Sequence, residues 1–71
     1  MERNPVSSTS IHSVGYDPQE KILEIEFKSG EIYQYEGVPL DVYTALLEAD
    51  SHGKYFLSQI RDQYTFQKIT G

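Results

Sequence analysis

The chain has 71 residues, no cysteine, and a formal net charge of −5 from eleven acidic and six basic residues. This length predicts a single domain. The lack of cysteine excludes disulfides, thiolate metal sites and a cysteine nucleophile. Because the basic residues are few and scattered, composition argues against a broad, non-specific nucleic-acid binder and leaves room only for a small basic patch.

The chain has no apolar run close to the roughly 20 residues of a membrane span. Its start, Met1-Glu2-Arg3-Asn4-Pro5, also lacks the pattern of a signal peptide. We therefore expect a soluble, cytoplasmic protein with no membrane partner and no cofactor.

The first half of the chain predicts an arm and three strands. Residues 1–9 are polar and without a period, which predicts a flexible arm before one domain at residues 10–71. Ser10–Tyr16 is predicted to be the first strand. Apolar and charged residues alternate in Lys21–Lys28, the pattern of a half-buried strand, and Glu31–Glu36 is the third.

The second half predicts two helices and a last strand. Leu40–Ala49 has apolar residues at helical spacing. Ser51 is typical of an N-cap for a second helix at His52–Gln63, and Tyr64–Ile69 alternates again as a short strand. The predicted fold class is α+β: a small antiparallel sheet with two helices on one face, in the order β-β-β-α-α-β.

The turn between the second and third strands decides where Tyr33 and Tyr35 point. A two-residue turn would place both tyrosines opposite glutamates. A three-residue turn that ends at Gly30 in the left-handed conformation places Tyr33 opposite Ile25 and Tyr35 opposite Leu23. We favour the second register, because glycine suits that position and the apolar faces of the strands then agree. It predicts both rings beneath the helices, and contact with a ligand is the alternative.

A series of aromatic, glycine and proline residues in the middle of the chain resembles the KTSC domain family. The matching stretches are Phe27-x-x-Gly30-x-x-Tyr33-x-Tyr35-x-Gly37-Val38-Pro39, then Tyr43, Ala49-x-Ser51-x-Gly53-x-Tyr55-Phe56 and Ile60-Arg61. The resemblance extends from about Ser10 to Ile69. This family is named for its place at the C-terminus of some lysyl-tRNA synthetases, and it also occurs as small stand-alone bacterial proteins. The resemblance therefore implies RNA binding by association.

The start of the second helix is the strongest candidate site that the residues themselves indicate. Unpaired N–H groups at a helix N-terminus favour anions. Gly53 would let an anion approach, and Lys54 would add a positive charge. The alternative is purely structural: Ser51 caps the helix and Gly53 allows close packing. If RNA binds, we expect Ser51, Gly53, Lys54, Tyr55 and Arg61 to contact it, together with Tyr33 and Tyr35.

Other clusters of polar residues favour ordinary roles. Glu24 and Glu26 alternate with apolar residues and are expected on a solvated face of the sheet. His12 and His52 lie far apart without a metal-binding spacing, so we expect no metal. No serine lies in a nucleophile-elbow motif. We therefore expect no enzymatic activity.

Two functions remain open at the level of sequence. One is a small non-catalytic binding domain whose partner is RNA, in particular tRNA. The other is a protein-interaction or self-associating module, which the acidic surface and six tyrosines would suit. The pattern leaves the oligomeric state undetermined.

Overall fold

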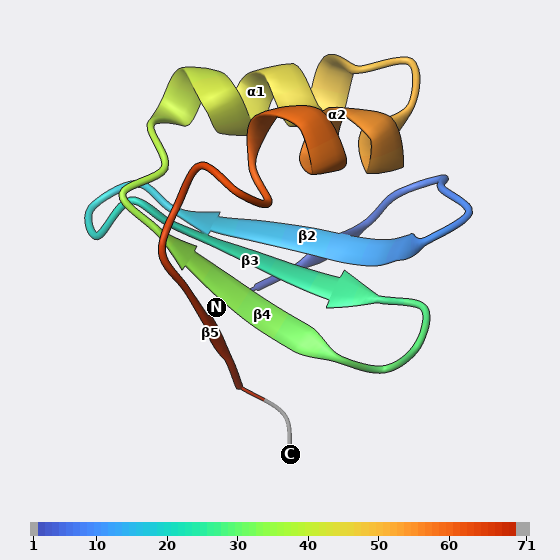
Figure 1. Cartoon of the computed structure of the whole chain (residues 1–71), viewed down its shortest axis with the longest axis horizontal. Coiled ribbons are helices and arrows are strands. Elements are labelled where there is room, and N and C mark those ends of the chain that lie inside the picture. The colour runs from blue at the N-terminus through green and yellow to red at the C-terminus, as the bar shows by residue number, and fades with distance from the viewer. Residues whose placement is uncertain (1, 70–71) are drawn as a thin grey trace.

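The computed structural model describes residues 2–69 and forms one antiparallel sheet covered by two helices on one face (Figure 1). The elements are β1 (Asn4–Pro5), β2 (Ile11–Asp17), β3 (Ile22–Phe27), β4 (Ile32–Glu36), α1 (Leu40–Glu48), α2 (His52–Gln59) and β5 (Phe66–Lys68). The strands lie in the order β1-β2-β3-β4-β5. The predicted α+β fold is confirmed, with one strand more than predicted. Residues 70 and 71 of the predicted domain lie outside the described residues.

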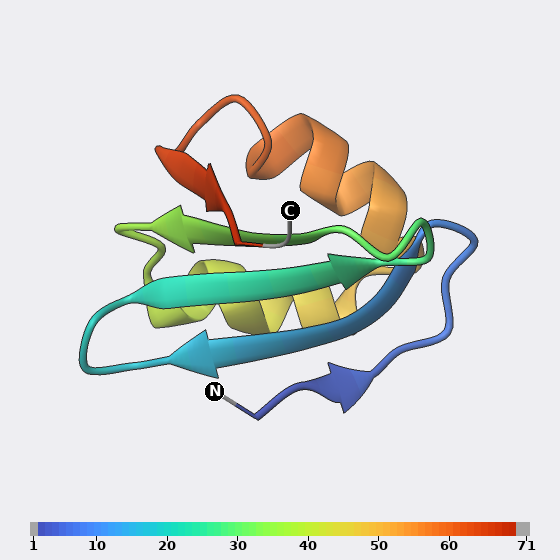
Figure 2. The same cartoon turned by 90° about the horizontal axis from the view of Figure 1, so that it is seen from below.

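The additional strand, β1, lies within the predicted N-terminal arm. Asn4 pairs with Val14 and Pro5 with Ser13, and β1 runs antiparallel along the edge of the sheet (Figure 2). A proline is tolerated here because the N–H that it lacks is not needed on the outer side of an edge strand. The flexibility of the arm stays a prediction. The structure shows that Asn4 and Pro5 of the arm pair with β2.

The hairpin between β3 and β4 has the register predicted from Gly30. Ile25 lies opposite Tyr33 and Leu23 opposite Tyr35. Gly30 has a φ of 98°, and its N–H donates to the carbonyl of Phe27. This left-handed conformation favours glycine, because a side chain would strain the backbone there.

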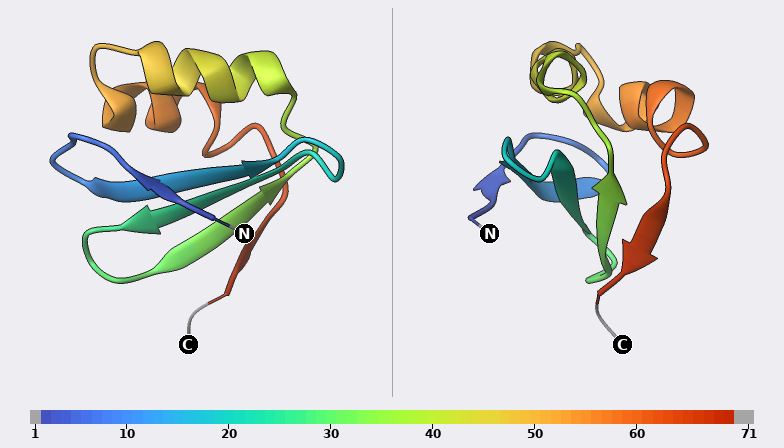
Figure 3. Two further views of the ribbon diagram at one scale, coloured as in Figure 1. Left: turned by 180° about the vertical axis from the view of Figure 1, so that it is seen from behind. Right: turned by 90° about the vertical axis from the view of Figure 1, so that its left-hand side faces the viewer.

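The core lies between the sheet and the helices (Figure 3). The buried apolar residues come from every layer: Ile11, Val14, Leu23, Ile25, Tyr35, Val38, Leu46, Phe56 and Ile60. Ser51 caps α2 as predicted, because its Oγ accepts a hydrogen bond from the Lys54 N–H at 3.3 Å. The helix ends at Gln59, earlier than predicted.

The expectation that Glu24 is solvated is wrong. Only 4% of Glu24 is exposed, because the Arg3 side chain reaches from the edge of the sheet past Gly15 to its carboxylate. The Arg3 guanidinium donates to the Glu24 carboxylate, and Gln34 Nε2 donates to it at 2.8 Å. Arg3 also lies 3.4 Å from the carboxylate of Glu26, which is half-buried. The buried charge of Glu24 is thus paired, as burial of a carboxylate requires.

Candidate functional site: an aromatic groove beside α2

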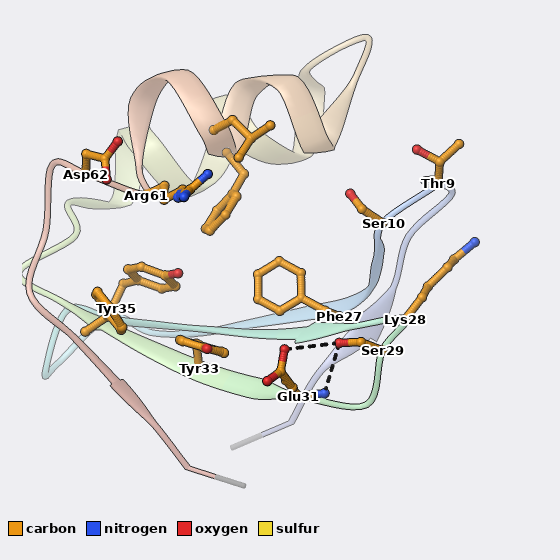
Figure 4. A pocket seen from close by; sticks show the side chains of 13 residues that line it. Thr9, Ser10, Phe27, Lys28, Ser29, Glu31, Tyr33, Tyr35, Arg61 and Asp62 are labelled. Carbon is orange, nitrogen blue, oxygen red and sulfur yellow. Dashed lines mark hydrogen bonds between the residues drawn. The ribbon is translucent and has the colours of Figure 1, made fainter.

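An open groove of about 690 Å³ lies between α2 and the helix-facing side of the sheet (Figure 4). Five of its thirteen lining residues are aromatic, and the rings come from four elements: Phe27, Tyr33, Tyr35, Phe56 and Phe66. Aromatic rings and polar side chains both line the groove, a combination that ligand sites commonly have.

The rings meet because strand side chains alternate between the two faces of a sheet. Tyr33 and Tyr35 are two residues apart on β4, and Phe66 of β5 lies opposite Tyr35. Their side chains therefore share the face that α2 covers, where Phe56 projects from the helix. The Tyr35 and Phe56 ring centroids are 5.4 Å apart with the rings nearly perpendicular, a favourable edge-to-face contact.

The five rings contact one another, but two of them remain partly exposed to solvent. Phe66 lies 5.5 Å from Tyr33 and 5.6 Å from Tyr35, centroid to centroid. Phe66 is nevertheless 51% exposed, and Tyr33 is half-buried. These two rings keep exposed surface in the groove, whereas Tyr35 and Phe56 belong to the core.

Charged residues of both signs surround the rings. Lys28 and Glu31 lie at the end of the groove near the hairpin, and Arg61 and Asp62 lie at the end near the last turn of α2 (Figure 4). Lys68 of β5 pairs with Glu31 at 2.9 Å and adds a third cation beside the groove. The groove is thus close to neutral in a chain whose net charge is −5.

The Tyr35 hydroxyl is a neutral donor at physiological pH. Burial raises the pKa of Tyr35 to about 12; Tyr33 and Asp62 add to the rise, and Arg61 opposes it. The hydroxyl therefore stays protonated and can donate a hydrogen bond into the groove, toward which it points in Figure 4.

The structure divides the predicted site residues into two groups. Tyr33, Tyr35 and Arg61 line the groove, whereas Ser51, Gly53, Lys54 and Tyr55 lie at the start of α2 and are not part of its lining. A binding role for this second group stays a prediction.

Ser51 and Gly53 have contacts that agree with the structural roles that the sequence offered as the alternative to anion binding. The Ser51 hydroxyl caps the helix. A Cβ on Gly53 would lie 2.9 Å from the Ser10 Oγ, so glycine allows the helix start to approach the segment before β2.

Phe27, Phe56 and Phe66 line the groove but were not predicted from the sequence as site residues. Phe27 and Phe56 are part of the family motif, and Phe66 lies in the alternating pattern of the last strand. A signal for Phe66 was present, since the alternation of that strand places Tyr64, Phe66 and Lys68 on one side. Only the pairing of β5 with β4 assigns that side to the groove.

Within residues 2–69, no group of three or more His, Cys, Asp or Glu side chains could hold a metal ion. His52 Nδ1 lies 2.8 Å from the carbonyl oxygen of Leu46, at the connection between the helices. In the same part of the chain, no helix is long and apolar enough to cross a membrane.

Comparisons with known proteins place this arrangement in a family. The KTSC domain model matches residues 7–64. An uncharacterized protein of Stutzerimonas stutzeri is 50% identical over 64 residues, which are 90% of each chain. The crystal structure of a KTSC domain protein from Yersinia pestis is 40% identical and covers 97% of both chains with a TM-score of 0.95.

The same domain also occurs inside a larger enzyme. A lysine–tRNA ligase of Nostoc sp. is 38% identical over 60 residues, which are 84% of this chain and 11% of the ligase. The fold, the motif residues and these relatives agree: the chain belongs to the KTSC domain family.

Proposed function

We propose that this domain is a non-catalytic module that binds unpaired RNA in the aromatic groove. The observation that carries the proposal is that two partly exposed rings, Tyr33 and Phe66, line the same groove as the guanidinium of Arg61. Unpaired bases stack on aromatic side chains, and arginine binds the phosphates between them.

The distribution of charge supports this proposal. An acidic protein must gather its few cations on one face to hold a phosphate backbone. Three of the six basic residues, Lys28, Arg61 and Lys68, lie in or beside the groove. Because Glu31 and Asp62 also lie there, we expect weak affinity and only a modest dependence on salt.

The relatives support RNA as the class of partner. A lysine–tRNA ligase carries this domain, and such an enzyme handles tRNA. A groove that accepts unpaired nucleotides would suit the single-stranded parts of a folded RNA, where bases are free to stack.

The test is a titration of the labelled domain with single-stranded hexamers of adenylate and of uridylate, followed by amide NMR. We expect shifts at Tyr33, Arg61 and Phe66. Phe66→Ala should weaken binding by about 5- to 150-fold, since stacking on one aromatic ring contributes roughly 1–3 kcal/mol per base. Leu40→Ala is the matched control, because Leu40 is 58% exposed and lies on α1 outside the groove.

Two results would reject the proposal. One is a wild-type spectrum that does not move with either hexamer at low salt. The other is equal binding by the Phe66→Ala and Leu40→Ala variants, which would mean that the groove is not the RNA site.

A protein partner is the second candidate, favoured by a specific observation. Leu57, Phe66 and Ile69 are 54%, 51% and 44% exposed, and the last two flank the edge of the sheet at β5. An open edge with exposed apolar residues can pair with another strand. Association through this edge should depend little on salt, whereas RNA binding should weaken as salt rises. The size of the domain in solution tests self-association directly.

A further inference from the structure

We infer that Arg61 and the Tyr35 hydroxyl form a phosphate subsite at one end of the groove. The inference rests on the proposed function and deepens it. It places the phosphate contact at the C-terminal end of α2, whereas the sequence predicts an anion site at the start of that helix.

The last turn of α2 directs Arg61 into the groove. The N–H groups of Ile60 and Arg61 both donate to the Phe56 carbonyl, at 3.0 and 2.9 Å, so the final turn is wider than an ordinary α-helical turn. Ile60 is fully buried and anchors this turn in the core. The side chain of Arg61 then extends between the helix and the sheet (Figure 4).

The guanidinium of Arg61 is available to a ligand. Among residues 2–69 it makes no hydrogen bond and no ion pair, whereas Arg3 and Lys68 are both paired with carboxylates. It lies near enough to Tyr35 to oppose the rise of that residue's pKa. Two kinds of donor, a planar guanidinium and a neutral hydroxyl, therefore serve the same end of the groove.

These donors fit a phosphate better than an uncharged group. A guanidinium can donate two parallel hydrogen bonds to phosphate oxygens, and a hydroxyl can donate a third. Two nearby features oppose an anion: the Asp62 carboxylate and the partial negative charge at the C-terminus of a helix. The attraction of Arg61 for a phosphate must exceed the repulsion from both features. Because a guanidinium donates two parallel hydrogen bonds and a lysine ammonium cannot, we expect that lysine does not replace it.

The subsite also sets the orientation of a nucleotide in the groove. The Tyr35 ring lies 5.6 Å from the ring of Phe66 and 6.4 Å from that of Tyr33. A phosphate held by Arg61 and Tyr35 would therefore place the adjoining base over the accessible faces of Phe66 and Tyr33. The groove thus takes a nucleotide with its phosphate toward α2 and its base toward β5.

The experiment repeats the hexaadenylate titration with variants of the subsite at several salt concentrations. We expect Arg61→Gln to weaken binding about tenfold and to reduce the salt slope by about 1, the loss of one phosphate contact. Arg61→Lys should not restore the affinity. Tyr35→Phe, which keeps the ring, should weaken binding about threefold, and Asp62→Asn should strengthen it. Lys54→Gln, at the start of α2, should bind as the wild type does.

The results separate this inference from the function on which it rests. If the wild-type domain binds no hexamer, the proposed function fails, and the subsite fails with it. If Phe66→Ala weakens binding but Arg61→Gln and Tyr35→Phe do not, RNA lies in the groove and the subsite is wrong. If Lys54→Gln alone loses affinity and salt slope, the phosphate is held at the start of α2, which also overturns the subsite.

Discussion

Gly15 allows the N-terminal segment to lie close against β2 at the edge of the sheet. It pairs with Glu24 on β3, and a Cβ at this position would clash with the main-chain oxygen of Glu2 and press on the Arg3 side chain. Because glycine leaves this space open, Arg3 reaches across β2 to the buried carboxylate. Gly15 thus provides the space that the Arg3 side chain needs to pair with Glu24.

Replacement of Gly15 tests this account. Gly15→Ala should displace the N-terminal segment and destabilise the domain by about 1–3 kcal/mol, the usual cost of inserting a side chain into a filled space. Urea unfolding measures the loss. Amide exchange at Val6, whose N–H donates to the His12 carbonyl at 3.1 Å, should become faster.

The control for this prediction is a double-mutant cycle with Arg3→Met. Both substitutions disrupt the same contact, so their losses should not add. Strictly additive losses would mean that Gly15 and Arg3 act independently, contrary to the geometry.

The groove residues differ in how far local sequence predicts them. The side of the sheet that Tyr33 and Tyr35 occupy follows from a hairpin whose register Gly30 fixes, so the pattern of a few residues is enough. Phe66 joins them only through the pairing of β5 with β4, which the chain makes after two intervening helices. Such long-range pairing leaves no local signal, which is why the aromatic groove itself was not predicted.

The same distinction holds for whole elements. Elements with a local start or stop signal were predicted within a few residues, as at the Gly30 turn and the Ser51 cap. β1 was missed because two residues, one of them proline, carry no alternation, and its place depends on Gly15 and Glu24 further along the chain. The early end of α2 likewise depends on how Ile60 packs into the core.

The Ser51 cap contributes to the stability of α2. Ser51→Ala should destabilise the domain by ~1 kcal/mol, because the Lys54 N–H loses its acceptor. Ser58→Ala is the matched control: Ser58 is an exposed serine of the same helix, and its hydroxyl donates only to the carbonyl of Tyr55. Urea midpoints should fall for Ser51→Ala and hardly change for Ser58→Ala. Equal midpoints would show that the cap contributes nothing.

Titratable groups in and beside the groove, namely Glu31, Lys68 and Tyr35, also make the stability of the whole domain depend on pH. The hydrogen bond with Lys68 lowers the pKa of Glu31 from its usual 4.5 and raises that of Lys68 from 10.5. The stabilisation by this pair is therefore lost as pH falls through the lowered pKa of Glu31 or rises through the raised pKa of Lys68. Both side chains are exposed, so the pair is a weak stabiliser.

Tyr35 gives the alkaline side of the stability profile a stronger dependence on pH. Its pKa is raised from 10.0 to about 12, chiefly by burial, so above pH 10 the unfolded chain loses this proton before the folded chain does. Stability that is fully present below pH 10 should thus fall between pH 10 and 12. Tyr35→Phe removes this loss and keeps the ring in the core.

The measurement is urea unfolding of the wild type and Tyr35→Phe at pH 8, 10 and 11. The wild type should lose stability relative to the variant at the highest pH, and a smaller fall common to both is expected from Tyr16, whose pKa burial also raises. An equal fall in the two proteins would mean that Tyr35 ionises in the folded state as easily as in the unfolded chain. Since a phenol with a pKa of 10 is still protonated near neutral pH, that result would contradict the burial of the Tyr35 hydroxyl and leave its role as a donor in the groove to the binding experiment.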